Sequence, residues 1–207
     1  GYVTNSDGTA RLQGYGVDAN GKIVNGVLTD LRIDTSNLAP KSTSNVSSTI
    51  NLNSTSPVID QTVAANKFDP SKTETFTKSF STPIYDTQGN QHTMDQYMVK
   101  TGANTWDTYT LIDGRNPDGS DPKVTAPIAS TMSFDSTGKL TSVSTPVTPP
   151  TTPPTSVISS DLKVANWTPG SVTNGVWTAN GASADPAGLT IAMANTTQFN
   201  ADTARSI

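Results

Sequence analysis

Apolar and polar residues alternate over short stretches along most of the chain. Residues 27–33 carry an apolar or β-branched residue at every second position, and residues 46–52 do so except for Ser48. A period of two puts these side chains on one face of a β-strand, so both stretches are predicted to be strands with one buried face. In all, the pattern predicts about ten short strands, at 27–33, 46–52, 76–84, 94–100, 106–111, 131–134, 140–143, 162–167, 176–179 and 189–193.

A hairpin-turn pattern, Asp-x-x-Gly followed by Lys or Asn, occurs three times, and its glycines are Gly21, Gly89 and Gly138. Asp is favoured at the first position of a type I turn, and Gly at the fourth tolerates the positive φ that returns the chain. We therefore expect a positive φ at all three glycines. The second turn joins the predicted strands 76–84 and 94–100, and the strand that follows completes a three-stranded meander.

Helical periodicity is almost absent, and 63–67 and 201–205 are the only short candidates for helices. Two polar stretches suggest boundaries, one at 34–44 and one at 146–154. The second contains two Pro-Pro pairs, which favour extended backbone and predict a stiff surface loop or a strand-flanking arm. The predicted fold class is all-β, an antiparallel β-barrel or sandwich with part of a second small β domain.

Composition narrows the possible functions. About 57 of the 207 residues are Ser or Thr, 33% are hydrophobic, none is Cys, and the formal net charge is -4. A disulfide scaffold is impossible, and without Lys/Arg clusters neither nucleic acid nor a membrane surface is an expected partner. The longest apolar runs have four residues, too few to span a bilayer, and no signal peptide is visible. Because the chain starts without Met, we expect it to be a fragment of a longer protein.

Candidate chemistry is sparse. The single histidine, His92, has no nucleophile or carboxylate partner suggested by the sequence, so a surface or edge-strand position is expected. The absence of Cys nearly excludes zinc and thiol sites. The acidic loop 113–121 could wrap Ca²⁺ but lacks the EF-hand spacing, and turn structure is the expected role of its Asp residues. We predict no enzyme activity and no catalytic, cofactor-binding or metal-binding residues.

Five large aromatic residues leave one alternative open. They could form an exposed platform for stacking on sugars, or they could pack in the core, which is their more ordinary use. The five are Trp106, Trp167, Trp177, Tyr97 and Tyr109. An exposed row would favour an extracellular carbohydrate- or surface-binding β module.

One block of the chain resembles the bacterial flagellar hook proteins. The turn Tyr-Asp-Thr-Gln-Gly-Asn-Gln-His at 85–92 is the most specific part of the likeness. The strand 97–100, which ends in Val-Lys, and the Trp-x-x-Tyr strand 106–109 follow it in the family's order. Further segments that resemble the family in the same order are 12–16, 40–43, 50–58, 76–80 and 131–140.

This resemblance implies a structural subunit of the flagellar hook, the curved extracellular tube that acts as a universal joint between motor rod and filament. It implies that residues 1–40 are part of the inner β domain, 41–198 the surface-exposed outer domain, and 199–207 a return segment to the inner domain. The implied partners are other copies of the hook protein. The family's polymerising terminal helices are absent from this sequence, so we expect the fragment itself to be monomeric.

Overall fold

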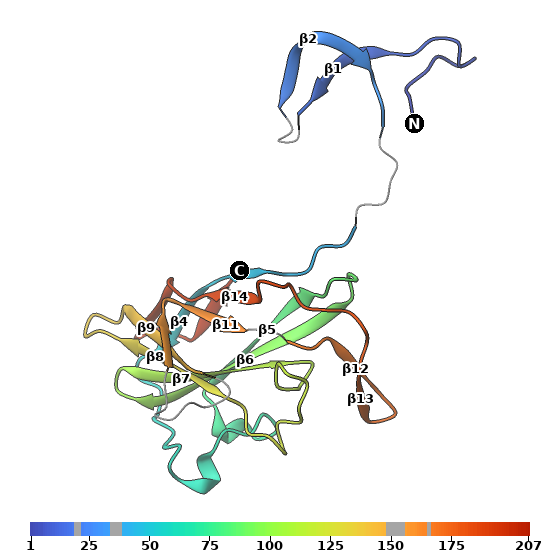
Figure 1. Ribbon diagram of the computed structural model, residues 1–207. Coiled ribbons are helices and arrows are strands. Elements are labelled where there is room, and N and C mark those ends of the chain that lie inside the picture. The colour runs from blue at the N-terminus through green and yellow to red at the C-terminus, as the bar shows by residue number, and fades with distance from the viewer. Residues whose placement is uncertain (19–21, 34–38, 148–155, 165–166) are drawn as a thin grey trace. The chain divides into compact units, whose positions relative to one another are not determined.

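The computed structural model describes all residues except 19–21, 34–38, 148–155 and 165–166 (Figure 1). The chain divides into two compact units, Gly1–Ala39 and Pro40–Ile207. The described residues form sixteen β-strands and two three-residue 3₁₀-helices. The predicted all-β class is therefore confirmed.

The first unit is built on a two-stranded antiparallel ribbon. Its strands are β1 (Gln13–Val17) and β2 (Ile23–Asp30), and Gly14 pairs with Thr29. The prediction of one buried face over 27–33 is wrong, because apolar side chains on both faces of β2 are exposed. In the described part of this unit the ribbon is a single layer, so alternation alone buries nothing. Gly21, the first of the predicted turn glycines, lies outside the described residues.

The second unit contains a six-stranded antiparallel sheet in the order β10-β9-β8-β7-β6-β5. The predicted meander over 76–111 is confirmed, because β5, β6 and β7 follow one another in the chain and pair in that order in the sheet. The strands are β5 (Lys78–Tyr85), β6 (Gln91–Gly102), β7 (Thr105–Ile112), β8 (Ala129–Phe134), β9 (Leu140–Pro146) and β10 (Ser156–Ser159).

Smaller sheets complete the second unit, and two of their pairings are parallel. One three-stranded sheet has the order β11-β14-β3, another has the order β15-β4-β16, and β12 and β13 form a hairpin. The β14–β3 and β15–β4 pairs are parallel, which the predicted antiparallel arrangement did not include. The strands are β3 (Asn45–Ser47), β4 (Thr49–Asn53), β11 (Asp161–Val164), β12 (Gly170–Thr173), β13 (Val176–Ala179), β14 (Leu189–Ala192), β15 (Thr196–Phe199) and β16 (Ala204–Ser206).

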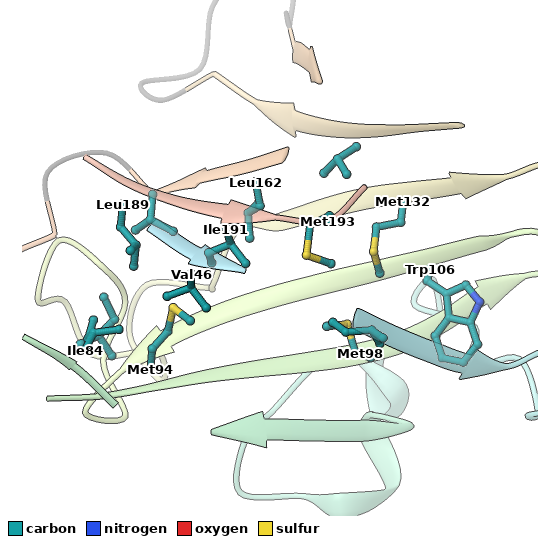
Figure 2. Close-up of a cluster of buried hydrophobic side chains, with 14 of the residues drawn as sticks. Val46, Ile84, Met94, Met98, Trp106, Met132, Leu162, Leu189, Ile191 and Met193 are labelled. Atoms are coloured by element: carbon teal, nitrogen blue, oxygen red, sulfur yellow. The ribbon is translucent and has the colours of Figure 1, made fainter. Parts of the chain in front are cut away.

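The hydrophobic core lies between the six-stranded sheet and the small sheets, as in a sandwich (Figure 2). Alternate residues of the long strands point into it, so β6 contributes Met94 and Met98 while β7 contributes Trp106. From the opposite layer come Leu162 and Ile191, on the paired strands β11 and β14. The period-two pattern buries one face here because a second layer covers it.

The helix predictions had mixed outcomes. The stretch 63–67 contains the 3₁₀-helix η1 (Ala64–Asn66), and a second short helix is η2 (Thr73–Thr75). The predicted helix at 201–205 is wrong, because Ala204–Ser206 forms β16 and pairs with β4. Backbone pairing with β4 outweighs the weak local helix preference. Neither described helix is long and apolar enough to cross a membrane.

The predicted boundaries are only partly comparable with the structure. The two units meet at Ala39 and Pro40, but identifying them as inner and outer domains stays a prediction. Residues 204–206 pair within the second unit, and a return of 199–207 toward the first also stays a prediction. Most of the proline-rich stretch 146–154 lies outside the described residues.

Candidate functional site

The turn between β5 and β6 forms the first part of the candidate site. Asp86 is fully buried, and its Oδ1 accepts hydrogen bonds from the backbone N–H groups of Gln88 and Asn90, both at 2.9 Å. Gly89 closes the turn with a φ of 83°, and its N–H donates to the Asp86 carbonyl at 3.1 Å. The predicted positive φ is confirmed at Gly89 and, with a φ of 80°, at Gly138.

His92 lies between two carboxylates. Its Nδ1 is 2.6 Å from Oδ2 of Asp113, and its Nε2 is 3.2 Å from Oδ2 of Asp86. Each ring nitrogen of His92 therefore faces a carboxylate oxygen, and an ionised carboxylate can accept a hydrogen bond from an imidazole N–H.

The prediction that His92 occupies a surface or edge position is wrong. The side chain is 4% exposed, and the ring packs against the ring of Trp167 at 5.0 Å between centroids. Strand β6 is also interior, since it pairs with β5 on one side and β7 on the other. A buried imidazole ring loses its hydrogen bonds to water, and the two carboxylates replace them.

The carboxyl group of Asp86 collects hydrogen bonds from three side chains. Burial alone would raise its pKa, but donors from Asn90, His92 and Asn180 outweigh burial and lower the pKa of Asp86 well below its usual range. The amide nitrogens of Asn90 and Asn180 lie 2.9 Å and 3.1 Å from Oδ2. We call the five residues Asp86, Asn90, His92, Asp113 and Asn180 the histidine network.

The histidine network anchors the hairpin β12–β13, which stands at one side of the second unit (Figure 1). Asn180 directly follows β13, so its bond to the network holds the end of that strand. Thr87 and Ser183 add two bonds at 3.0 Å, one between backbone groups and one from the Ser183 N–H to the Thr87 hydroxyl. Trp177 lies so close to Gly119 that a Cβ there would come within 2.4 Å of its ring. These contacts fasten the hairpin to the β5–β6 turn and to the loop 113–121.

The network has the properties of a structural cross-link. A catalytic histidine needs a nitrogen free to take a proton from a nucleophile. Both nitrogens of His92 face carboxylates instead, so the ring links the β5–β6 turn to the loop that begins at Asp113. The expectation of no catalytic, cofactor-binding or metal-binding residues stays a prediction.

The carboxylates of the acidic loop 113–121 accept hydrogen bonds from other groups of the protein. Asp113 accepts from His92 and from the Thr93 N–H. Asp118 accepts from both the N–H and the hydroxyl of Ser120, and Asp121 accepts from the Lys123 N–H. Such side-chain caps on turns form without an ion. Within the described residues, no group of three or more His, Cys, Asp or Glu side chains is arranged to hold a metal ion.

The five large aromatic residues do not form one exposed row. Trp106 and Trp167 are buried, and the Trp106 Nε1 donates to Oε1 of Gln198 at 2.5 Å. Tyr97 and Tyr109 lie on the other face of the large sheet, where Phe68 stacks on Tyr109 at 4.1 Å. Burial and the neighbouring Asp107 raise the pKa of Tyr109 to about 12. The aromatic residues therefore serve packing, as expected of the more ordinary alternative.

Sequence reasoning missed the histidine network, because it suggested no carboxylate partner for His92. Asp113 is 21 residues from His92, and Asn180 is 94 residues from Asp86. The spacing within the turn 85–92 marks Asp86 and His92, because both belong to one hairpin. No local pattern marks the two distant partners, which the tertiary fold brings in.

Comparison with known proteins gives a consistent result. Residues 51–206, about three quarters of the chain, match the model described as the flagellar basal body protein FlaE D2 domain. The flagellar hook protein FlgE of Escherichia coli (strain K12) is 38% identical over 112 residues, which cover 54% of this chain and 25% of that protein. FlgE of Salmonella typhimurium is 41% identical over 107 residues, covering 51% and 24%. The chain thus spans about a quarter of the length of these curated relatives.

Proposed function

This chain belongs to the family of flagellar basal body protein FlaE D2 domains, and on that premise we propose that it is a structural piece of a bacterial flagellar hook. The observation that carries the proposal is the match of 38% and 41% identity to proteins named flagellar hook protein. The proposed role is mechanical, as part of the curved tube that joins the motor rod to the filament.

We assign the second unit to the surface-exposed outer domain of the subunit. In this proposal residues 41–198 form that domain, 1–40 belong to the inner β domain, and 199–207 lead back to it. The second unit has its own core, and the histidine network braces its hairpin, so it can act as a rigid body. The exposed ribbon of the first unit would gain its missing layer from other parts of the full subunit.

The proposed partners are other copies of the hook protein in the extracellular tube, while the isolated fragment is monomeric. A chain rich in Ser and Thr and with a net charge of only -4 favours wet, weak contacts between copies. Water bridges can replace lost hydrogen bonds at such contacts with little loss of free energy. Contacts of this kind let neighbouring subunits slide while the tube bends.

Deleting residues 41–198 from the full-length parent protein and joining the flanks tests this division of roles. The expected product still assembles into tubes, because polymerisation belongs to the inner parts of the subunit. Those tubes should differ in curvature or in resistance to shear, because the lateral outer contacts are gone. Electron microscopy of the filaments measures both properties.

The matched control carries the same joining sequence inserted at residue 40 without the deletion, and its tubes should keep the parental curvature. A deletion protein that folds and is exported but never assembles would make the outer domain a required polymerisation element. Sedimentation of the fragment gives an independent check, since a stable dimer at micromolar concentration contradicts the proposed monomer.

A further inference from the structure

A small cavity in the second unit lies outside the histidine network. It has a volume of about 250 Å³. The large sheet contributes Thr108 and Thr110 from β7 and Ser130 from β8, and the opposite layer contributes Leu162 from β11. The loop residue Asn116 closes one end. The cavity therefore has hydroxyl groups on one wall and an apolar surface on the other.

Three residues that line this cavity each have a buried polar atom with no hydrogen-bond partner among the described residues. The atoms are Oγ1 of Thr108, Oγ1 of Thr110 and Oδ1 of Asn116, and these residues are 1%, 9% and 7% exposed. Buried polar groups in folded proteins nearly always have a partner, because an unpaired one loses its bonds to water without replacement. Single unpartnered atoms occur elsewhere in the described residues, but here three belong to residues that line one cavity, so an occupant that forms hydrogen bonds could partner all three.

The orientation of Asn116 defines what the occupant must supply. Its Nδ2 donates to the Ser120 hydroxyl at 3.0 Å and to the Thr125 carbonyl at 2.8 Å. These two bonds fix the amide, so Oδ1 is left as an acceptor and requires a donor from the occupant. The hydroxyls of Thr108 and Thr110 can each donate or accept. Groups that do both, such as hydroxyls, match all three positions.

The charge around the cavity points to a neutral occupant. The two charged lining residues are Asp118, whose carboxylate already accepts from Ser120, and Lys163, whose side chain is exposed. The three unpartnered groups are neutral. Ile128 and Leu162 add an apolar wall suited to C–H groups. The volume is below the 300–1,000 Å³ typical of pockets for drug-sized ligands, so the occupant is smaller than those.

We propose that this cavity is a binding site for a small neutral polyhydroxy compound, a polyol or a single sugar unit, held by Thr108, Thr110 and Asn116. Such a compound has several hydroxyls for the polar wall and a carbon face for the apolar wall. This proposal does not depend on the proposed role in the hook, because every residue that lines the cavity belongs to the second unit of a single chain. Ordered water is the competing occupant and is an outcome of the test.

Titration of the whole chain with glycerol, myo-inositol and D-glucose, followed by ¹H–¹⁵N NMR, tests the proposal. Saturable shifts confined to amides around Thr108, Thr110 and Asn116 are expected for at least one compound. Thr110→Val keeps the shape but removes the hydroxyl and should weaken binding at least tenfold. Thr110→Ser keeps a hydroxyl and should bind within a fewfold of the parent.

Thr82→Val is the matched control, because Thr82 is also buried and unpartnered but does not line the cavity. It should leave the affinity unchanged. The absence of saturable shifts up to 100 mM of all three compounds, or a crystal soak showing ordered water only on the three atoms, would overturn the proposal. If Thr110→Val fails to fold, Thr108→Ser and Thr108→Val provide the same comparison on the neighbouring hydroxyl.

Discussion

The two units of this chain are built from similar strand sequences, yet only one has a core. None of the described residues of Gly1–Ala39 is buried, and Tyr15, Ile23 and Val27 are 52%, 59% and 67% exposed. In Pro40–Ile207 the same kind of alternation buries residues such as Trp106 completely. Alternation therefore predicts a strand, whereas burial depends on a second layer that the strand cannot supply by itself.

Because of this difference, the two units should contribute unequally to the free energy of unfolding. Burial of apolar surface contributes roughly 25 cal/mol per Å², and an isolated two-stranded ribbon is marginally stable at best in water. The second unit buries side chains from both of its layers (Figure 2). We therefore expect the second unit to unfold cooperatively and the first to contribute little to that transition.

Truncating one aromatic residue in each unit should give the largest contrast. Trp106→Ala should lower the free energy of unfolding by about 4 kcal/mol, because it leaves a large cavity and removes the donor to Gln198. Tyr15→Ala, at an exposed position of the ribbon, should change it by less than about 0.5 kcal/mol. Urea unfolding followed by far-UV circular dichroism measures both. Equal losses would mean that the two units share one cooperative transition.

Two glycines with nearly the same positive φ but different surroundings should differ next most in the stability that an Ala substitution costs. Gly138 has a φ of 80°, and a Cβ there would lie 2.3 Å from the Gln198 carbonyl oxygen, whereas Gly181, with a φ of 83°, has open space around it. Gly181→Ala should cost about 1 kcal/mol from backbone strain, and Gly138→Ala about 3 kcal/mol because the clash adds to the strain.

Gly8, in the first unit, has a φ of 72° and also has open space around it. Gly8→Ala should leave the unfolding of the second unit unchanged. Thermal unfolding of the Gly8→Ala, Gly181→Ala and Gly138→Ala variants ranks them by the loss of stability. A Gly138→Ala variant no less stable than Gly181→Ala would show that the chain relieves the clash by moving the strand that carries Gln198.

Local chemistry explains which features the sequence could predict. Gly89 and Gly138 were predictable because turn geometry depends on neighbouring residues, and the meander followed from the short connections between its strands. The parallel β14–β3 pair was not predictable, since its strands are far apart in the chain and nothing local marks their contact. Likewise, the turn pattern predicted the role of Asp86 in closing the hairpin, but it predicted neither the burial of His92 nor its contacts with two carboxylates.

The histidine network provides a smaller and more local test. His92→Gln replaces the ring whose two nitrogens contact Asp86 and Asp113 by a side chain with a single amide group. It should lower the free energy of unfolding by about 2 kcal/mol, in the range for a hydrogen bond to a charged group. The control is Gln91→Ala at the exposed neighbouring position, which should cost less than about 0.5 kcal/mol. Urea unfolding gives both values, and hydrogen exchange should show faster opening of β12–β13 in His92→Gln.

Unchanged exchange in that hairpin, with the overall stability lowered, would show that the network supports the large sheet and does not anchor β12–β13. Faster exchange confined to the hairpin, with unchanged global stability, would show anchoring alone. The expected result combines both effects, because His92 belongs to β6 while its partner Asp86 also binds Asn180.

The smallest expected effect is a difference between two aspartates whose pKa is lowered in the folded chain, one in each unit. Hydrogen bonds outweigh burial to lower the pKa of Asp86, and the hydrogen bond from Arg11 is the main cause of the lowered pKa of Asp30. A lowered folded pKa gives stability that is present above the unfolded pKa, near 3.9, and is lost as the pH falls through the folded pKa. For Asp86 this lies below about pH 4.

Asp86→Asn should therefore have a lower free energy of unfolding than the parent at pH 7. This difference should shrink as the pH falls below about 4, because the unfolded parent then takes up a proton that its folded form does not bind, which favours unfolding of the parent but not of the variant. Asp30→Asn should have the same free energy of unfolding as the parent at every pH tested. Its ion pair with Arg11 is exposed to solvent and screened, and its unit contributes little to the unfolding transition. Urea unfolding at pH 7, 4 and 3 measures the difference in the free energy of unfolding between each variant and the parent. A difference for Asp86→Asn that stays constant over this range would mean that its bonds to Asn90 and Asn180 matter through geometry and not through charge.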